Sequence, residues 1–191
     1  MRNTILLALV GLISGLLSFL INYLPFLDVL LDQWKLFIAA GFVFGVVIAL
    51  YFLLLQKQAS IMKLLLWIAA SIGSYYVAVI TVIDFPFTLD YPDEFFFPLI
   101  SGGIVGAFLM LLGFKHLLHS ISKKQLLELT FLGGILGLSW YIIPDHLFFP
   151  SEPPNDVFAG EKLLSLYIFW QMGMAGALGW VMDRAGNGKN R

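Results

Sequence analysis

Six long apolar stretches, separated by charged or proline-rich breaks, constrain the fold of this chain more than any other feature. They cover residues 4–24, 36–55, 61–83, 97–114, 126–143 and 163–182. A helix of about 20 apolar residues matches the hydrocarbon thickness of a bilayer, and a chain in lipid must satisfy its own backbone hydrogen bonds. The sequence therefore predicts an all-α, polytopic membrane bundle of six transmembrane helices in a single domain, 1–191.

The composition requires a lipid-facing surface. Of 191 residues, 60% are hydrophobic and 12% are charged, and the mean hydropathy is +0.90. A soluble domain carries about 25% charged residues, and a soluble protein of this length could not hide so much apolar surface. The net charge of −1 gives no general attraction to nucleic acid. The chain contains no cysteine, which excludes disulfides and thiolate metal sites.

The first apolar stretch also begins like a secretory signal, with Arg2 before the apolar run. The run is longer than the roughly 7–15 residues of a signal core, and it lacks a convincing A-x-A cleavage site. We therefore expect this stretch to be retained as the first membrane helix.

The breaks between the apolar stretches alternate between mostly basic and mostly acidic. With the N-terminus in the cytoplasm, nine of the eleven lysines and arginines fall on the inner side, and ten of the twelve acids fall on the outer side. Basic residues are enriched in the cytoplasmic loops of membrane proteins. The pattern predicts cytoplasmic N- and C-termini in a bacterial-type plasma (inner) membrane.

Each predicted helix carries two small residues four positions apart, which let helix backbones approach closely in lipid. The pairs are Gly11/Gly15, Gly41/Gly45, Ala69/Gly73, Gly103/Ala107, Gly133/Gly137 and Gly173/Ala177. A proline near an acid also follows each odd-numbered helix, so the pattern is compatible with three repeated hairpins at 1–56, 57–122 and 123–183. The alternative is coincidence, because the chain has 18 glycines.

Gln171 is a polar residue near the middle of the last predicted span. A buried amide must find hydrogen-bond partners. One interpretation is a bond to a serine of the third span or to a backbone carbonyl. The other is a polar contact inside a ligand cavity with aromatic walls. The candidate residues under these interpretations are Gln171, Trp170, Tyr75, Tyr76, Ser71 and Ser74.

Glu128 is the only acid inside a predicted span, and it is a further candidate ligand-binding residue. It lies in the first turn of its span, four residues after Lys124, where its side chain can reach the interface. An interfacial salt bridge is favoured over a coupling-ion site. The lack of a deep acid argues against a proton- or sodium-driven pump.

Two groups of residues could in principle bind a metal ion. His116 and His119 are three apart and share a helix face, but no further ligand completes a structural zinc site. Clustered loop carboxylates could instead hold a divalent cation on the outer side, or they could simply be solvated. The candidate residues of this outer site are Asp84, Asp90, Asp145 and His146.

Motifs of the common enzyme classes are missing from the sequence. There is no G-x-S-x-G elbow, no H-E-x-x-H and no phosphate loop, and we expect no cofactor. The sequence favours a non-enzymatic membrane subunit or scaffold that packs in the lipid bilayer against a membrane-protein partner or a second copy of itself. The alternative is a small transporter, channel or ligand-capturing subunit with a cavity near mid-membrane.

Overall fold

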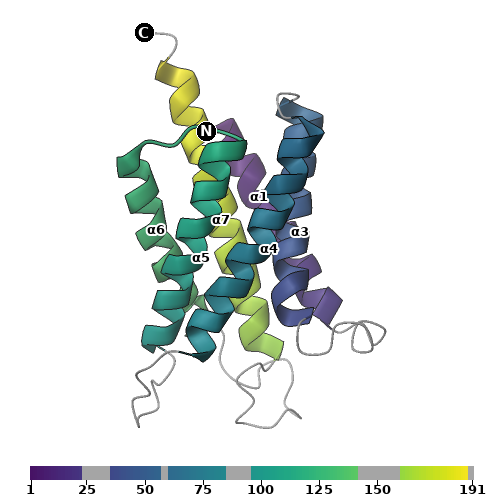
Figure 1. The fold of residues 1–191 in the computed structure, drawn as a ribbon, viewed down its shortest axis with the longest axis vertical. Coiled ribbons are helices and arrows are strands. Elements are labelled where there is room, and N and C mark those ends of the chain that lie inside the picture. Colours follow the sequence, from purple (N-terminus) through teal and green to yellow (C-terminus); the bar gives the residue numbers. More distant parts are fainter. Residues whose placement is uncertain (23–34, 57–59, 85–95, 142–159, 189–191) are drawn as a thin grey trace.

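The computed structural model describes residues 1–22, 35–56, 60–84, 96–141 and 160–188. The α-helices in these ranges are α1 (Arg2–Asn22), α3 (Lys35–Tyr51), α4 (Ile61–Ile83), α5 (Phe96–Leu117), α6 (Lys123–Gly137) and α7 (Gly160–Gly188). A π-helical turn, Phe52–Gln56, follows α3, and a 3₁₀ turn, Leu138–Tyr141, follows α6. The described ranges contain no strand, which confirms the predicted all-α class (Figure 1).

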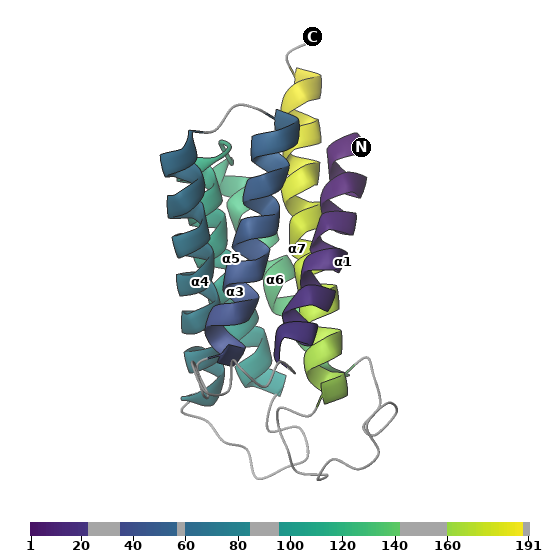
Figure 2. The same cartoon turned by 90° about the vertical axis from the view of Figure 1, so that its right-hand side faces the viewer.

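The helices form a ring in chain order (Figures 1 and 2). Each helix packs against the next one along the chain, and α7 returns to pack against α1 in the most extensive contact of the bundle. Since the chain reverses direction between successive helices, the start of α1 and the end of α7 lie at the same end. No pair of neighbouring helices is set apart as a hairpin, so the threefold repeat stays a prediction.

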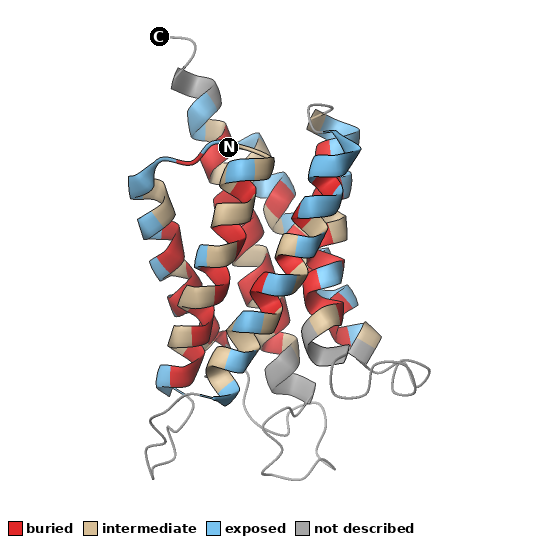
Figure 3. Ribbon diagram, in the orientation of Figure 1, coloured by how far each residue is buried: buried red, intermediate tan, exposed pale blue. Residues whose placement is uncertain are grey.

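Five helices are long and apolar enough to cross a membrane. The spans within the described ranges are Arg2–Ile21, Ile38–Gln56, Ile61–Ile83, Phe96–Leu117 and Leu164–Ala185. Large apolar side chains lie exposed along their outer sides, among them Ile5, Leu9, Ile13, Leu65 and Phe108. Buried residues face the inside of the bundle (Figure 3). This distribution fits a bundle whose outer surface contacts lipid.

The fifth predicted span, 126–143, starts three residues after the corresponding helix of the structure, and its last two residues lie outside the described ranges. Helix α6 begins at Lys123 because Ser122 and Gln125 form a capping box, with hydrogen bonds of 3.1 and 3.2 Å. It ends at Gly137 after 15 residues, three of its last five being glycine, a poor helix former. Helix α6 is about 22 Å long, and the 3₁₀ turn Leu138–Tyr141 continues it directly by about 8 Å. Within the described ranges five helices have the length and hydropathy of a membrane span, while α6 by itself is too short for one, so a full-length sixth span in this region stays a prediction.

The interior is built around aromatic rings from three helices. The ring of Phe44 on α3 lies 6.5 Å from Trp67, 6.2 Å from Tyr75 and 6.3 Å from Trp170, measured between centroids. The indole N–H of Trp67 donates to the carbonyl of Gly45 at 3.1 Å. Tilted and edge-to-face rings stabilise a core beyond the burial of their area, so this cluster ties α3, α4 and α7 together.

The predicted small-residue pairs on α5 and α6 lie against each other. A Cβ added to Gly103 would overlap the carbonyl oxygen of Gly133, and one added to Gly137 would overlap that of Leu99. The methyl group of Ala107 fills the space beside Gly133. At this seam the two backbones are in direct contact, which only small residues allow.

The pairs on α1 and α3 lie against the backbone of one neighbouring helix each. A Cβ added to Gly15 would stand 2.7 Å from backbone atoms of α7, and one added to Gly41 would stand 2.7 Å from the backbone of α4. Gly11 and Gly45 meet the same two helices one turn further along. Both seams therefore leave no space for a side chain.

The remaining two pairs behave differently from each other. A Cβ added to Gly173 on α7 would stand 2.6 Å from the side chain of Leu136 on α6, and Ala177 is buried. Ala69 and Gly73 on α4 are both exposed, and a Cβ on Gly73 would meet nothing within 4 Å. Within the described chain no other helix lies close to Gly73, so packing of this α4 pair against another helix stays a prediction.

Candidate functional site

A partly open pocket lies among α4, α5, α6 and α7. Its volume is about 80 Å³. Its wall is almost entirely apolar, and three aromatic residues, Tyr75, Tyr167 and Trp170, supply its largest side chains. Such a shape suits a small molecule, or the end of a larger one, held by apolar contacts.

The aromatic wall is held in place by its own packing. The rings of Tyr75 and Trp170 meet edge to face, with centroids 5.0 Å apart and an interplanar angle of 74°. Both rings also contact Phe44 from the far side of the bundle. Tyr75, Trp170 and Phe44 are all buried, so the wall consists of packed interior side chains and not of loose surface ones.

Glycines also line the pocket and bring the helices close on either side of it. A Cβ added to Gly102 of α5 would stand 2.8 Å from the carbonyl oxygen of Ala78 on α4. Gly103 and Gly137, which also line the pocket, belong to the tight α5–α6 seam. The pocket is therefore bounded by two seams where the backbones touch, which limits how far it can widen.

Gln171 is fully buried beside this pocket, although it does not belong to the wall that its neighbour Trp170 forms. Its amide nitrogen donates to the hydroxyl of Ser18 on α1 at 3.0 Å. The predicted interhelical bond therefore exists, but its partner lies on α1 and not at Ser71 or Ser74. The Gln171 amide oxygen has no hydrogen-bond partner among the described residues.

The hydroxyl of Tyr75 is the second buried polar group of this region without a hydrogen-bond partner in the described residues. Tyr75 is 8% exposed, and the Gln171 side chain lies near enough to act on its hydroxyl as a hydrogen-bonding neighbour, although not within ideal hydrogen-bond geometry. Buried polar atoms without partners are uncommon, and each requires an explanation. Here two of them lie next to one pocket.

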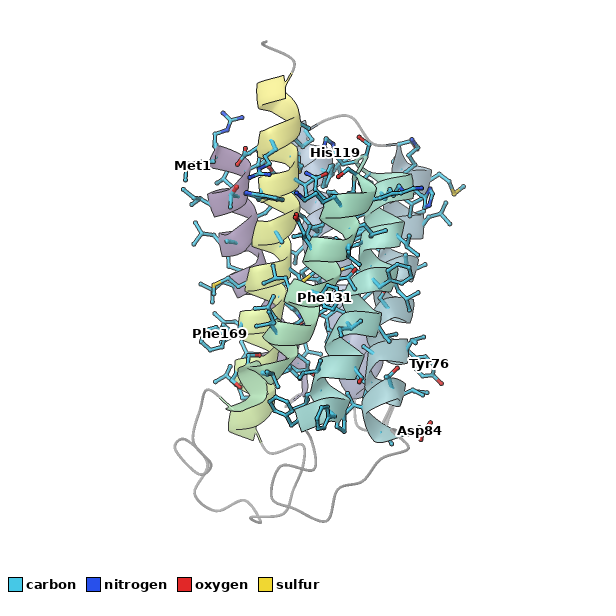
Figure 4. The ribbon with its side chains drawn as sticks, turned by 90° about the vertical axis from the view of Figure 1, so that its left-hand side faces the viewer. Met1, Tyr76, Asp84, His119, Phe131 and Phe169 are labelled. Atoms are coloured by element: carbon cyan, nitrogen blue, oxygen red, sulfur yellow. The ribbon has the colours of Figure 1, made fainter. Side chains whose placement is uncertain are left out.

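Three other candidate residues have roles outside the pocket. Ser71 donates to the carbonyl of Gly41 on α3 at 2.8 Å, and Ser74 donates to the carbonyl of Ala70 in its own helix at 2.7 Å. Tyr76 is half-buried and lies at the outer edge of the bundle (Figure 4). Of the six candidate residues in this group, Gln171 included, only Tyr75 and Trp170 line the pocket.

Glu128 lies far from the pocket, near the start of α6, while Gly137 lines the pocket at the other end of this helix. Its carboxylate is 3.8 Å from the ammonium group of Lys124, and its side chain is 48% exposed. Exposed ion pairs of this kind contribute little to stability. The geometry is that of an interfacial ion pair, and it offers no site for an ion inside the membrane.

The candidate outer metal site cannot be assembled from the described residues. Asp84 ends α4, where its backbone N–H donates to the carbonyl of Ile80 at 2.8 Å. Asp90, Asp145 and His146 lie outside the described ranges. Within those ranges no three potential ligands among histidine, aspartate and glutamate come together, so the outer cation site stays a prediction.

Asp183 on α7 has a role that the sequence did not reveal. Its carboxylate accepts hydrogen bonds from the backbone N–H groups of Asn3 and Thr4 at 3.2 and 3.0 Å, and from the Thr4 hydroxyl at 2.7 Å. It also pairs with the amino group of Met1 at 2.7 Å. A carboxylate is favourable at the positive end of a helix, so α7 caps the start of α1.

A polar cluster extends this cap to α3. The hydroxyl of Tyr51 donates to the side-chain oxygen of Asn3 at 2.7 Å, and the amide of Gln56, in the π-helical turn, donates to the Tyr51 oxygen at 3.2 Å. These bonds join the ends of α1 and α3 where the basic residues gather. The only feature of the sequence that could have indicated this polar cluster is the acid Asp183, which lies among basic residues.

The fold and this site define the class of the protein as an all-α helical bundle with the apolar helices of an integral membrane protein. The chain matches no family model, no curated protein and no solved structure.

Proposed function

We propose that this protein is a non-enzymatic, multi-pass membrane protein that binds a small, largely apolar molecule in the pocket between α4, α5, α6 and α7. The pocket itself carries the proposal, because it combines a packed aromatic wall with lining glycines inside a close-packed bundle. The described wall has no carboxylate, imidazole or amine. This favours binding over catalysis, and it favours an uncharged ligand.

The proposed orientation puts both termini in the cytoplasm of a bacterial-type plasma membrane. Support comes from the basic residues at the end of the bundle that holds the start of α1 and the end of α7. In the described ranges these are Arg2, Lys63, Lys115, Lys123, Lys124 and Arg184. The pocket lies toward the other end of the helices, so in this orientation it occupies the outer half of the membrane.

The probe that tests this function is 1-bromopropane, because bromine quenches tryptophan emission on contact and the molecule is small and apolar. Quenching is measured in the wild-type protein and in Trp170→Phe, and the difference isolates the signal of Trp170. Val79→Phe fills the pocket, whereas Val77→Phe adds the same bulk on the exposed side of α4.

We expect saturable quenching of Trp170 in the wild-type protein and in Val77→Phe, and its loss in Val79→Phe. Quenching of Trp170 that rises linearly with concentration and is equal in all three proteins would show access from lipid without a binding site. That result would end the proposal.

A second candidate function is packing against a membrane partner or a second copy of the chain. It is favoured by α4, of which 22% is buried in its membrane window, the lowest share among the five spans, and by the exposed Ala69/Gly73 pair. In this case Gly73→Leu should abolish a complex seen by native mass spectrometry while the monomer still folds. A complex that survives Gly73→Leu excludes this face as the contact.

A further inference from the structure

Two lysines, Lys115 on α5 and Lys123 on α6, lie side by side at the end of the bundle that holds the N-terminus. In the seam between these helices, a Cβ added to Gly134 would stand 2.7 Å from the side chain of Ile104. Lys115 is eleven residues after Ile104, and Lys123 is eleven residues before Gly134. Eleven residues are about three helical turns, and the two helices run in opposite directions. The two lysines are therefore level with each other, on the same side of the seam as Ile104 and Gly134.

A short connection keeps these two helix ends together (Figure 1). Helix α5 ends at Leu117 and α6 begins at Lys123, so only residues 118–122 join them. The backbone N–H groups of Leu118 and His119 both donate to the carbonyl of Phe114, at 3.0 and 2.9 Å. The connection is thus a compact turn, and the backbones that carry the two lysines stay close.

Neither lysine has a counter-ion among the described residues. The nearest acid along α6 is Glu128, and its carboxylate pairs with Lys124 at 3.8 Å. No ion pair within the described ranges involves Lys115 or Lys123, and Lys115 is partly buried. Like charges that are held side by side repel each other, so this arrangement favours an anion between them.

The surface next to the two lysines, toward the middle of the membrane, is apolar. Phe108 is seven residues before Lys115 on the same face of α5, and Leu127 is one turn after Lys123 on α6. The two apolar side chains are 41% and 60% exposed. A pair of positive charges at the membrane boundary, with an exposed apolar strip beside it, matches the two parts of a phospholipid.

We propose that the α5–α6 seam binds an anionic phospholipid, with the phosphate between Lys115 and Lys123 and an acyl chain against Phe108 and Leu127. Basic sites between membrane helices bind anionic head groups on the cytoplasmic side, which is the side that the proposed orientation gives to these lysines. None of the four residues lines the pocket, so this lipid site does not depend on the ligand proposed there.

The competing explanation is that the two long side chains extend separately into the water at the membrane boundary. An anionic lipid would then respond to the total positive charge at this end of the bundle and not to this pair. The experiment must therefore compare two pairs of cationic residues from the same end.

The test is native mass spectrometry of the protein in mild detergent, titrated with palmitoyl-oleoyl phosphatidylglycerol. Palmitoyl-oleoyl phosphatidylcholine has the same acyl chains without the net negative charge and serves as the reference lipid. The double variant Lys115→Gln/Lys123→Gln removes the proposed site. The matched control is Lys63→Gln/Arg184→Gln, which removes two exposed charges from α4 and α7 at the same end.

We expect the dissociation constant of the first bound phosphatidylglycerol to rise by roughly thirtyfold in Lys115→Gln/Lys123→Gln, which is about fivefold for each lysine. The control variant should bind phosphatidylglycerol as the wild-type protein does. Binding of phosphatidylcholine should be weak in all three proteins.

Three results would overturn this proposal. Equal losses in the two double variants would show a response to total charge, and equal binding of both lipids by the wild-type protein would show no preference for an anion. Displacement of phosphatidylglycerol by glycerol 1-phosphate, which has no acyl chains, would show a site for a soluble phosphate compound. Each of these results leaves the proposed pocket untouched.

Discussion

Helices α7 and α4 are both apolar enough to span a membrane, but they differ in how much of each is buried in the bundle. In their membrane windows 61% of α7 is buried, against 22% of α4. On α7, Gly179 lies against the backbone of Asn3 and Thr4, so α1 occupies the space where a side chain would be. On α4, Gly73 faces open space. A glycine in a membrane helix therefore indicates a close helix contact only where a second helix lies directly against it.

The largest effect should come from Gly179→Ala, which tests the α7 side of this comparison. The new methyl group would overlap the carbonyl of Asn3 and approach the Cα of Thr4 to 2.7 Å. Forced overpacking costs about 1–3 kcal/mol and occasionally more, so the free energy of unfolding in mild detergent should fall by about 3 kcal/mol. A variant as stable as the wild-type protein would mean that α1 and α7 are further apart than described.

Asp183→Asn should have an intermediate effect at the end of the same seam. The amide still fits, but it loses the charge that caps the start of α1 through Asn3 and Thr4. Loss of a cap costs about 0.5–2 kcal/mol, and the midpoint of thermal unfolding should drop accordingly. Arg184→Gln is the control, since this exposed arginine lies over the ring of Trp180 and makes no contact with the cap in the described chain. Equal effects of both changes would refute the capping role.

The smallest effect, and one of opposite sign, is expected for Gly73→Ala on α4. Nothing lies within 4 Å of the added methyl group, and alanine is a better helix former than glycine by about 1 kcal/mol. The free energy of unfolding should therefore rise by about 0.5–1 kcal/mol. A decrease, measured on the same protein preparation as Gly179→Ala, would show that α4 already packs against something at this position.

The helices themselves could be predicted from the sequence, because apolar length in lipid leaves the backbone no other solution. The early start of α6 could also have been read from Ser122 and Gln125, which have the spacing of a capping box. The change from α-helix to a 3₁₀ turn after Gly137 could not be predicted, since hydropathy measures polarity and does not register that glycines weaken the final turn.

The candidate site was less accessible to sequence reasoning, because its contacts join residues that are far apart in the chain. Gln171 and Ser18 are 153 residues apart, and Asp183 meets Thr4 across nearly the whole sequence. Hydropathy places a polar residue at a depth in the membrane but does not say which helix it faces. The pocket could not be predicted for the same reason: four helices form its wall, and hydropathy does not show which helices are neighbours.

The central claim, a binding pocket inside the bundle, is tested most directly by the position of the bromine atom in crystals soaked with 1-bromopropane. The account predicts an anomalous scattering peak in the pocket lined by Trp170, Gly102 and Gly103, and no such peak in Val79→Phe. Bromine peaks confined to the outer, lipid-facing sides of the helices would contradict it.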